Sequence, residues 1–130
     1  MELNSWYTIL LAAVLPPFLL VGYIYYKDKY QREPVAWIIR AFCGGILSAF
    51  IAMFLELGLG LILPIVDNPT TWLGAILKGF VGAAMPEELT KLCVLVWLLR
   101  RNPYFDERFD GIVYAVCVGM GFAATENILY

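Results

Sequence analysis

Residues 71–99 read TWLGAILKGFVGAAMPEELTKLCVLVWLL, a stretch apolar enough to cross a membrane that nevertheless contains Glu87, Glu88 and Lys91. An ionisable side chain at membrane depth costs about 2.5–3.5 kcal/mol on insertion scales, so such residues usually have a function. A further acid, Glu126, lies in another apolar stretch near the end of the chain. Three carboxylates in two apolar stretches therefore indicate a functional site inside a membrane.

The rest of the chain has the composition of a membrane protein with several spans. Of its 130 residues, 62% are hydrophobic and 15% are charged, and the mean hydropathy is +0.75. The apolar residues fall in long blocks. Because lipid requires backbone polar groups to be bonded within the segment, we predict an all-α transmembrane helical bundle forming one domain over residues 1–130. About four spans are expected, at residues 5–26, 34–63, 71–99 and 110–130.

The distribution of basic residues predicts how the chain crosses the membrane. The loops after the first and third expected spans contain Lys and Arg, whereas the N-terminal tail and the loop after the second span contain none. The positive-inside rule then places these two loops in the cytoplasm and the N-terminus outside the cell membrane. The net charge of −2 gives no basic face for nucleic acid, so the expected partner is the lipid bilayer. The basic loop residues are Lys27, Lys29, Arg32, Arg100, Arg101 and Arg108.

Small residues recur at every fourth position in three of the expected spans. Such rows let membrane helices approach one another closely, so we predict tight helix packing. Pro86 lies inside the third span and is expected to break it, because proline lacks the backbone N–H that a continuous helix uses. The rows are Gly44-Ser48-Ala52-Glu56-Gly60, Ala75-Gly79-Ala83-Glu87-Lys91 and Gly111-Ala115-Gly119-Ala123-Asn127.

The acidic pair has the spacing of a helical acid–base group. Glu87 and Glu88 lie four and three residues before Lys91, on the side that favours a helical ion pair. Two neighbouring carboxylates in a low dielectric do not both ionise readily, so one pKa should rise while Lys91 stabilises the other charge. Such a pair activates water. Alternatively, Glu87, Glu88 and Glu126 supply oxygen ligands to a metal ion, or Glu87 and Lys91 only hold helices together.

A second polar group surrounds Glu126, which is followed by Asn127 and Tyr130. We expect Asn127 to donate a hydrogen bond to a developing oxyanion, with Tyr130 and Lys91 in supporting roles. Glu56, late in the second span, is expected to be a solvated carboxylate at the membrane boundary. Asp110 is expected to cap the fourth helix.

Three motifs together resemble those of the PrsW intramembrane proteases, relatives of the CAAX-processing and bacteriocin-processing membrane proteases. They are PEELTK at 86–91, FDGIVY at 109–114 and GMGFAATENILY at 119–130. The resemblance covers residues 79–130 well, and the first two spans match in hydropathy. It implies a bacterial endopeptidase that cleaves regulatory single-span membrane proteins such as anti-sigma factors.

The resemblance also implies roles for individual residues. Glu87 and Glu88 match the catalytic or metal-binding acids of the family, and Glu126 and Asn127 match its second site element. Zinc is implied because the family is called a metalloprotease family, although related proteins are argued to be glutamate peptidases.

The chain departs from the family pattern at one point. The family has a later helix with a histidine of the site, whereas this sequence contains no histidine and stops at Tyr130. We therefore expect it to be the amino-terminal part of a longer membrane protease. The alternatives are a non-enzymatic membrane scaffold or binding module of the same fold and, third, an ion or proton carrier that uses the buried acids.

Overall fold

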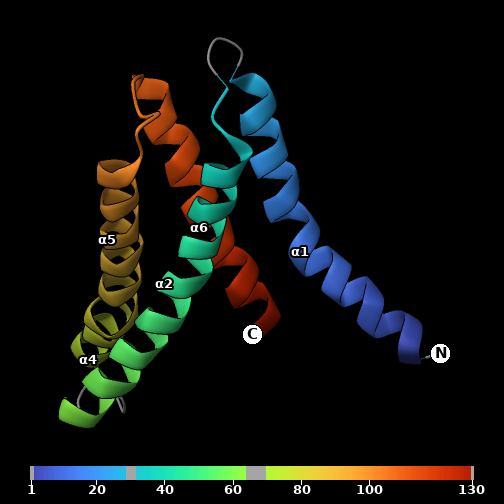
Figure 1. Cartoon of the computed structure of the whole chain (residues 1–130). Coiled ribbons are helices and arrows are strands. Elements are labelled where there is room, and N and C mark those ends of the chain that lie inside the picture. The colour runs from blue at the N-terminus through green and yellow to red at the C-terminus, as the bar shows by residue number, and fades with distance from the viewer. Residues whose placement is uncertain (1, 29–31, 64–69, 130) are drawn as a thin grey trace.

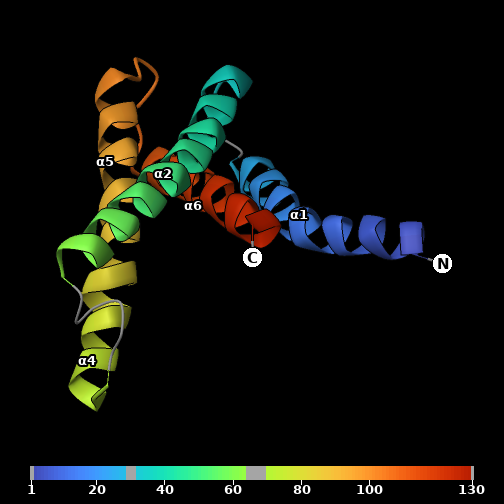
Figure 2. The same ribbon diagram turned by 90° about the horizontal axis from the view of Figure 1, so that it is seen from below.

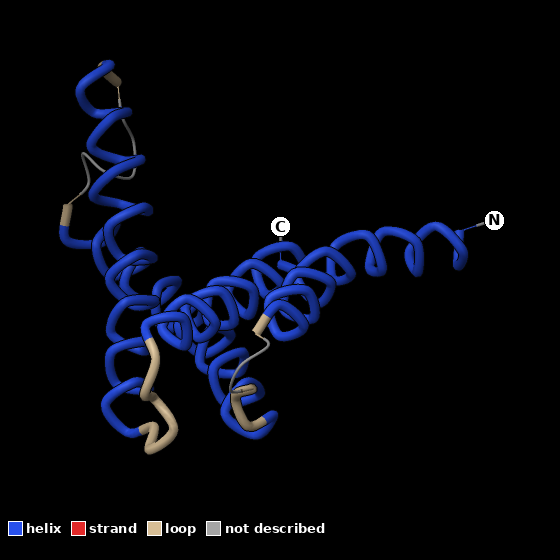
Figure 3. The backbone as a smooth tube through the Cα atoms, turned by 90° about the horizontal axis from the view of Figure 1, so that it is seen from above, coloured by secondary structure: helices blue, strands red, loops and turns tan. Residues whose placement is uncertain are grey.

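The computed structural model describes residues 2–28, 32–63 and 70–129, and it is built from helices (Figure 1). No strand occurs among these residues, as the tube in Figure 3 also shows. The all-α prediction is therefore confirmed. The helices are α1 (Glu2–Lys27), α2 (Val35–Ile62), α4 (Trp72–Leu77), the π-helical segment η1 (Lys78–Ala84), α5 (Met85–Arg101) and α6 (Arg108–Leu129).

Three helices are long and apolar enough, by length and composition, to cross a membrane. They are Ser5–Lys27 of α1, all of α2 and all of α6. The third expected span, residues 71–99, is instead made of α4, η1 and α5 joined end to end. The four predicted spans thus coincide with helical segments. The third span, which contains Glu87, Glu88 and Lys91, is the one that changes from α-helix to π-helix and back.

Pro86 lies directly after the change of helix type. Ala84 and Met85 keep right-handed helical dihedral angles, so the predicted break at this point is wrong. The N–H of Met85 donates to the carbonyl of Phe80, five residues earlier, which is the wide π pattern. Widening of this kind accommodates Pro86, which has no backbone N–H to donate. Such π-helical segments are also frequent at functional sites. The widened segment ends at Ala84, three residues before Glu87.

Helices α2 and α6 cross at van der Waals distance. A Cβ atom added to Gly45 would lie 2.0 Å from the carbonyl oxygen of Val118, and one added to Gly121 would lie 2.0 Å from that of Phe42. Only glycine permits this approach of two backbones. The predicted tight packing is therefore confirmed for this pair of helices.

The predicted rows of small residues are only partly correct. On α2, Ser48 and Ala52 are buried as expected. On α6, Gly119 has open space around its Cα, and the contact with α2 is made by the neighbouring Gly121 instead. Gly79 in η1 also has open space. A four-residue spacing therefore identified the correct face of α2 but not of α6.

Helix α1 packs mainly against α6 and also touches α2, where the rings of Phe18 and Phe42 lie 5.1 Å apart. Its N-terminal half diverges from the bundle, which Figures 1 and 2 show from two directions. Residues 5–12 are accordingly exposed. The divergence leaves the C-terminal half of α6 accessible from the side of α1.

A cluster of buried polar residues joins the helix ends opposite this opening; we call it the loop-end cluster. The Tyr114 hydroxyl donates to the carboxylate of Glu33, and the Asp110 carboxylate accepts the backbone N–H groups of Asp106 and Glu107 at 3.1 and 2.8 Å. Asp110 thus caps the start of α6 from inside its first turn, as the third residue of the helix, and not from the position before the helix that was expected. The cluster consists of Asp28, Glu33, Asn102, Asp110 and Tyr114, each at most 7% exposed.

Candidate functional site in the membrane-spanning bundle

Three half-buried carboxylates from three helices lie within electrostatic range of one another. Glu87 follows the π-helical segment at the start of α5, Glu126 lies near the end of α6, and Glu56 lies late in α2. Glu56 is within electrostatic range of both other acids, and Glu126 is within range of Glu87. We call Glu56, Glu87 and Glu126 the carboxylate cluster.

The structure corrects part of the prediction for Glu56. Its side chain is half-buried and lines the same small cavity as Glu126, so it is not fully solvated. The sequence contained a usable signal, because Glu56 continues the row of Ser48 and Ala52, both of which are buried against neighbouring helices. A carboxylate on the same face of a helix as buried residues points toward the same neighbouring helices.

Lys91 is the cation next to the cluster. Its ammonium lies 2.6 Å from a carboxylate oxygen of Glu88 and 4.0 Å from one of Glu87. The same ammonium lies 4.2 Å from the centroid of the Phe122 ring on α6. Lys91 therefore connects α5 to α6 by a cation–π contact and supplies positive charge beside Glu87.

The two adjacent acids of α5 have different surroundings. The side chain of Glu88 is 73% exposed, whereas that of Glu87 is 26% exposed. Consecutive residues of a helix point about 100° apart, so the two side chains reach different surroundings although both lie within 4.0 Å of Lys91. Glu87 is the member of the pair that faces Glu56 and Glu126, and Glu88 lies on the outer side with Lys91.

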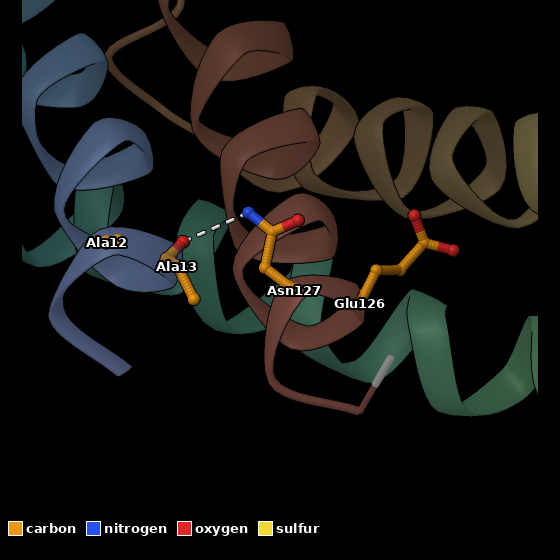
Figure 4. Close-up of a pocket in the computed structure, with 4 residues that line it drawn as sticks. All are labelled: Ala12, Ala13, Glu126 and Asn127. Carbon is orange, nitrogen blue, oxygen red and sulfur yellow. Dashed lines mark hydrogen bonds between the residues drawn. The ribbon is translucent and has the colours of Figure 1, made fainter. Parts of the chain in front are cut away.

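Asn127 and Glu126 point in different directions from α6 (Figure 4). The Asn127 amide donates to the backbone carbonyl of Ala13 on α1 at 3.0 Å, whereas the Glu126 carboxyl extends away from α1. Both residues line an open pocket of about 630 Å³ between α1 and α6, together with Ala12 and Ala13. The Asn127 amide is thus bonded to α1, although Asn127 lines the same pocket as Glu126. Tyr130, expected in a supporting role, lies outside the described residues.

The described residues do not form a metal site by themselves. They contain no group of three or more His, Cys, Asp or Glu side chains arranged to hold a metal ion. The carboxylate cluster supplies oxygen donors only, whereas zinc sites in proteins commonly include nitrogen or sulfur ligands. The three cysteines are free thiols, two exposed and one buried, in agreement with their apolar surroundings in the sequence.

The arrangement defines a class of protein. It is a multi-pass α-helical membrane protein in which half-buried acids from three helices lie near one another beside Lys91. Carboxylates held together in this way act on protons, as general bases or acids, or bind a cation.

Comparison with known proteins identifies the family. Residues 33–130 match the family described as PrsW family intramembrane metalloprotease, and the chain belongs to this family. The match includes Glu56, Glu87, Glu88, Lys91, Glu126 and Asn127.

Named relatives come from several bacteria. The protein named Protease PrsW of Geobacillus kaustophilus is 37% identical over 124 residues, which are 95% of this chain and 52% of that protein. Protease PrsW of Bacillus subtilis is 33% identical and that of Clostridioides difficile is 32% identical, with 54% and 49% of their lengths covered. The chain thus spans about half the length of the curated relatives it matches. No solved structure matches it.

Proposed function

We propose that the protein is an intramembrane endopeptidase in its full-length form, with residues 1–130 as the amino-terminal part of the protease domain. The observation that carries the proposal is the convergence of Glu56, Glu87 and Glu126 from three helices of a membrane-spanning bundle. Family membership supports the same reaction class. The substrates proposed are single-span regulatory membrane proteins such as anti-sigma factors.

The proposed reaction is hydrolysis of a peptide bond by water that a carboxylate activates. The carboxylate of Glu87 or Glu126 accepts a proton from water as the water oxygen adds to the peptide carbonyl carbon. The C–N bond then breaks, and the same proton passes to the departing nitrogen, so the carboxylate is regenerated. Between the two acids of α5 we assign the base role to Glu87, because it faces the other carboxylates and Glu88 faces outward.

Lys91 and Glu88 have supporting roles in this proposal. Lys91 sets the local charge beside Glu87, and Glu88 holds the lysine ammonium at 2.6 Å. The oxyanion role expected for Asn127 stays a prediction, because its amide would first have to leave the carbonyl of Ala13.

A zinc ion is the cofactor that the family description suggests. When bound, such an ion polarises the substrate carbonyl and lowers the pKa of bound water. The carboxylate cluster alone does not fit zinc, so the ion would need further ligands from outside the described residues. We also propose that the N-terminus lies outside the cell, from the basic loops after α1 and α5.

The test is cleavage of a single-span anti-sigma factor from the same genome by the full-length protein in membranes. Glu87→Gln and Glu126→Gln should each lower the rate of cleavage by about 10²–10⁴-fold, the usual contribution of a general acid or base. Glu107→Gln, which removes an exposed acid from the loop before α6, is the matched control and should cleave normally. Normal cleavage by Glu87→Gln would contradict the proposal and favour a binding function.

A further inference from the structure

A small cavity lies between α2 and α6 at the carboxylate cluster. The volume of this cavity is about 20 Å³. About 10–15 Å³ is enough to hold a water molecule, provided that polar partners are present. Its size therefore fits a single water molecule.

Two carboxyl groups are the polar lining of this cavity. Glu56 reaches it from α2 and Glu126 from α6, and the other lining residues are apolar: Ala49, Ala52, Met53, Phe122 and Leu129. Each carboxyl group presents two oxygens, so a water between them can donate one hydrogen to each side. A buried water needs two to four such partners, and the pair supplies them.

The apolar walls define the position of the cavity. Ala49, Ala52 and Phe122 are 7%, 1% and 3% exposed, so these side chains are fixed by packing. Phe122 also makes a cation–π contact with Lys91, whose ammonium lies 4.2 Å from the centroid of the Phe122 ring. The cavity is therefore adjacent, through one aromatic ring, to the lysine that contacts Glu87.

We propose that Glu56 is a positioning residue of the site, and that Glu56 and Glu126 together hold one water molecule in this cavity. Glu56 fixes the water against Glu126 so that one of its lone pairs is directed away from both carboxyl groups. The charged groups that face Glu56 from the helices packed against α2 are Glu87 and Glu126. Its part in hydrolysis rests on the proposed function, but the binding of water does not.

The experiment is hydroxyl-radical footprinting of the full-length protein by X-ray radiolysis, with mass spectrometry of the labelled peptides. Radicals formed from a bound water oxidise the side chains beside it, so Phe122 should be labelled although it is only 3% exposed. Leu98, at 1% exposed, is the internal control for a buried side chain and should remain unlabelled. Glu107→Gln should give the wild-type pattern.

Two variants at position 56 separate water binding from packing. Glu56→Gln keeps an oxygen acceptor and adds a donor, so the Phe122 label should persist. Glu56→Leu keeps the bulk but no polar partner, so the label should disappear while the protein remains folded. An unlabelled Phe122 in the wild type, or an equal label in Glu56→Leu, overturns the proposal.

Cleavage measured on the same variants distinguishes the two proposals. Glu56→Leu should lower kcat by about 100-fold, the loss expected for a misplaced reacting group, with KM unchanged, and Glu56→Gln should retain most of the rate. Label without any cleavage by the wild type would refute the protease function but not the water site. Wild-type cleavage by Glu56→Leu would refute the role of Glu56 and leave the protease function standing.

Discussion

The loop-end cluster and the carboxylate cluster both contain acidic side chains, but these differ in burial and in hydrogen bonding. In the loop-end cluster, acids at most 3% exposed receive hydrogen bonds from Tyr114 and from backbone amides. In the carboxylate cluster, acids are half-buried and meet one another with one lysine at the edge. Buried polar groups with partners stabilise a fold, whereas like charges held together without partners are typical of functional sites.

The two clusters also differ in their position along the helices. The loop-end cluster joins the linker before α2 to the start of α6, where the chain must be fixed in place. The carboxylate cluster lies toward the other end of α2 and α6, beyond their closest crossing at Gly45 and Gly121. We therefore expect changes in the first cluster to lower stability and changes in the second to lower activity.

The largest effect on both clusters should come from the crossing between them. Gly121→Ala places a Cβ atom against the carbonyl of Phe42, so α2 and α6 must separate. We expect a loss of stability of about 3 kcal/mol, the upper end of the range for overpacking, and a loss of cleavage with it. Thermal unfolding in detergent measures the change.

The neighbouring glycine is the matched control for this substitution. Gly119→Ala adds the same methyl group to the same helix in open space, so stability should be unchanged or rise by up to about 1 kcal/mol. Equal destabilisation by the two substitutions would show that the helix crossing is not where the structure has it.

The next effect should be seen in the loop-end cluster alone. Tyr114→Phe removes the hydroxyl that donates to Glu33 and leaves a buried carboxyl group without that partner. The expected loss of stability is about 1–3 kcal/mol, measured by thermal unfolding. Tyr104→Phe, at an exposed tyrosine of the loop before α6, should change nothing, and an equal loss in both variants would remove the special role of Tyr114.

A smaller effect should appear in the pH dependence of stability. Burial raises the pKa of the Glu33 carboxyl above its ordinary value of 4.5, and Asp110 raises it further, while the hydrogen bond from Tyr114 opposes the change. The fold thus favours the protonated form. The contribution of Glu33 to stability is present below the ordinary pKa and is lost as pH rises through the folded pKa.

Replacing Glu33 by Gln tests this sign. The variant should lose less thermal stability than the wild type when the pH is raised from acidic to neutral, because Gln does not ionise. Unfolding curves across this pH range provide the measurement. A steeper loss in Glu33→Gln than in the wild type would mean that the ionised carboxylate is the form favoured by the fold.

Much of the fold was predictable because hydropathy blocks and helical spacing are local properties. The bounds of α2, Val35–Ile62, lie next to the predicted 34–63, and the cap at Asp110 follows from local hydrogen bonding. The choice of Gly121 over Gly119 as the contact point was not predictable. It depends on the rotation of α6 about its axis, which is set by packing across helices.

The candidate site was predictable only in part for the same reason. Glu87, Glu126 and Lys91 are unusual within apolar stretches and were identified directly. Whether Glu87 or Glu88 faces the interior, and whether Asn127 shares the face of Glu126, depends on side-chain directions about 100° apart along a helix. Glu56 was predicted to be solvated because its distance along α2 was considered without the face on which it lies.

The most direct test compares one residue from each cluster in the same full-length protein. Cleavage per folded molecule and melting temperature should be measured for Glu126→Gln and Tyr114→Phe. We expect Glu126→Gln to lower cleavage by about 10²–10⁴-fold with an unchanged melting temperature. We expect Tyr114→Phe to lower the melting temperature with normal cleavage by the folded fraction. The reverse pattern, with the carboxylate needed for folding and the tyrosine for cleavage, would contradict these expectations.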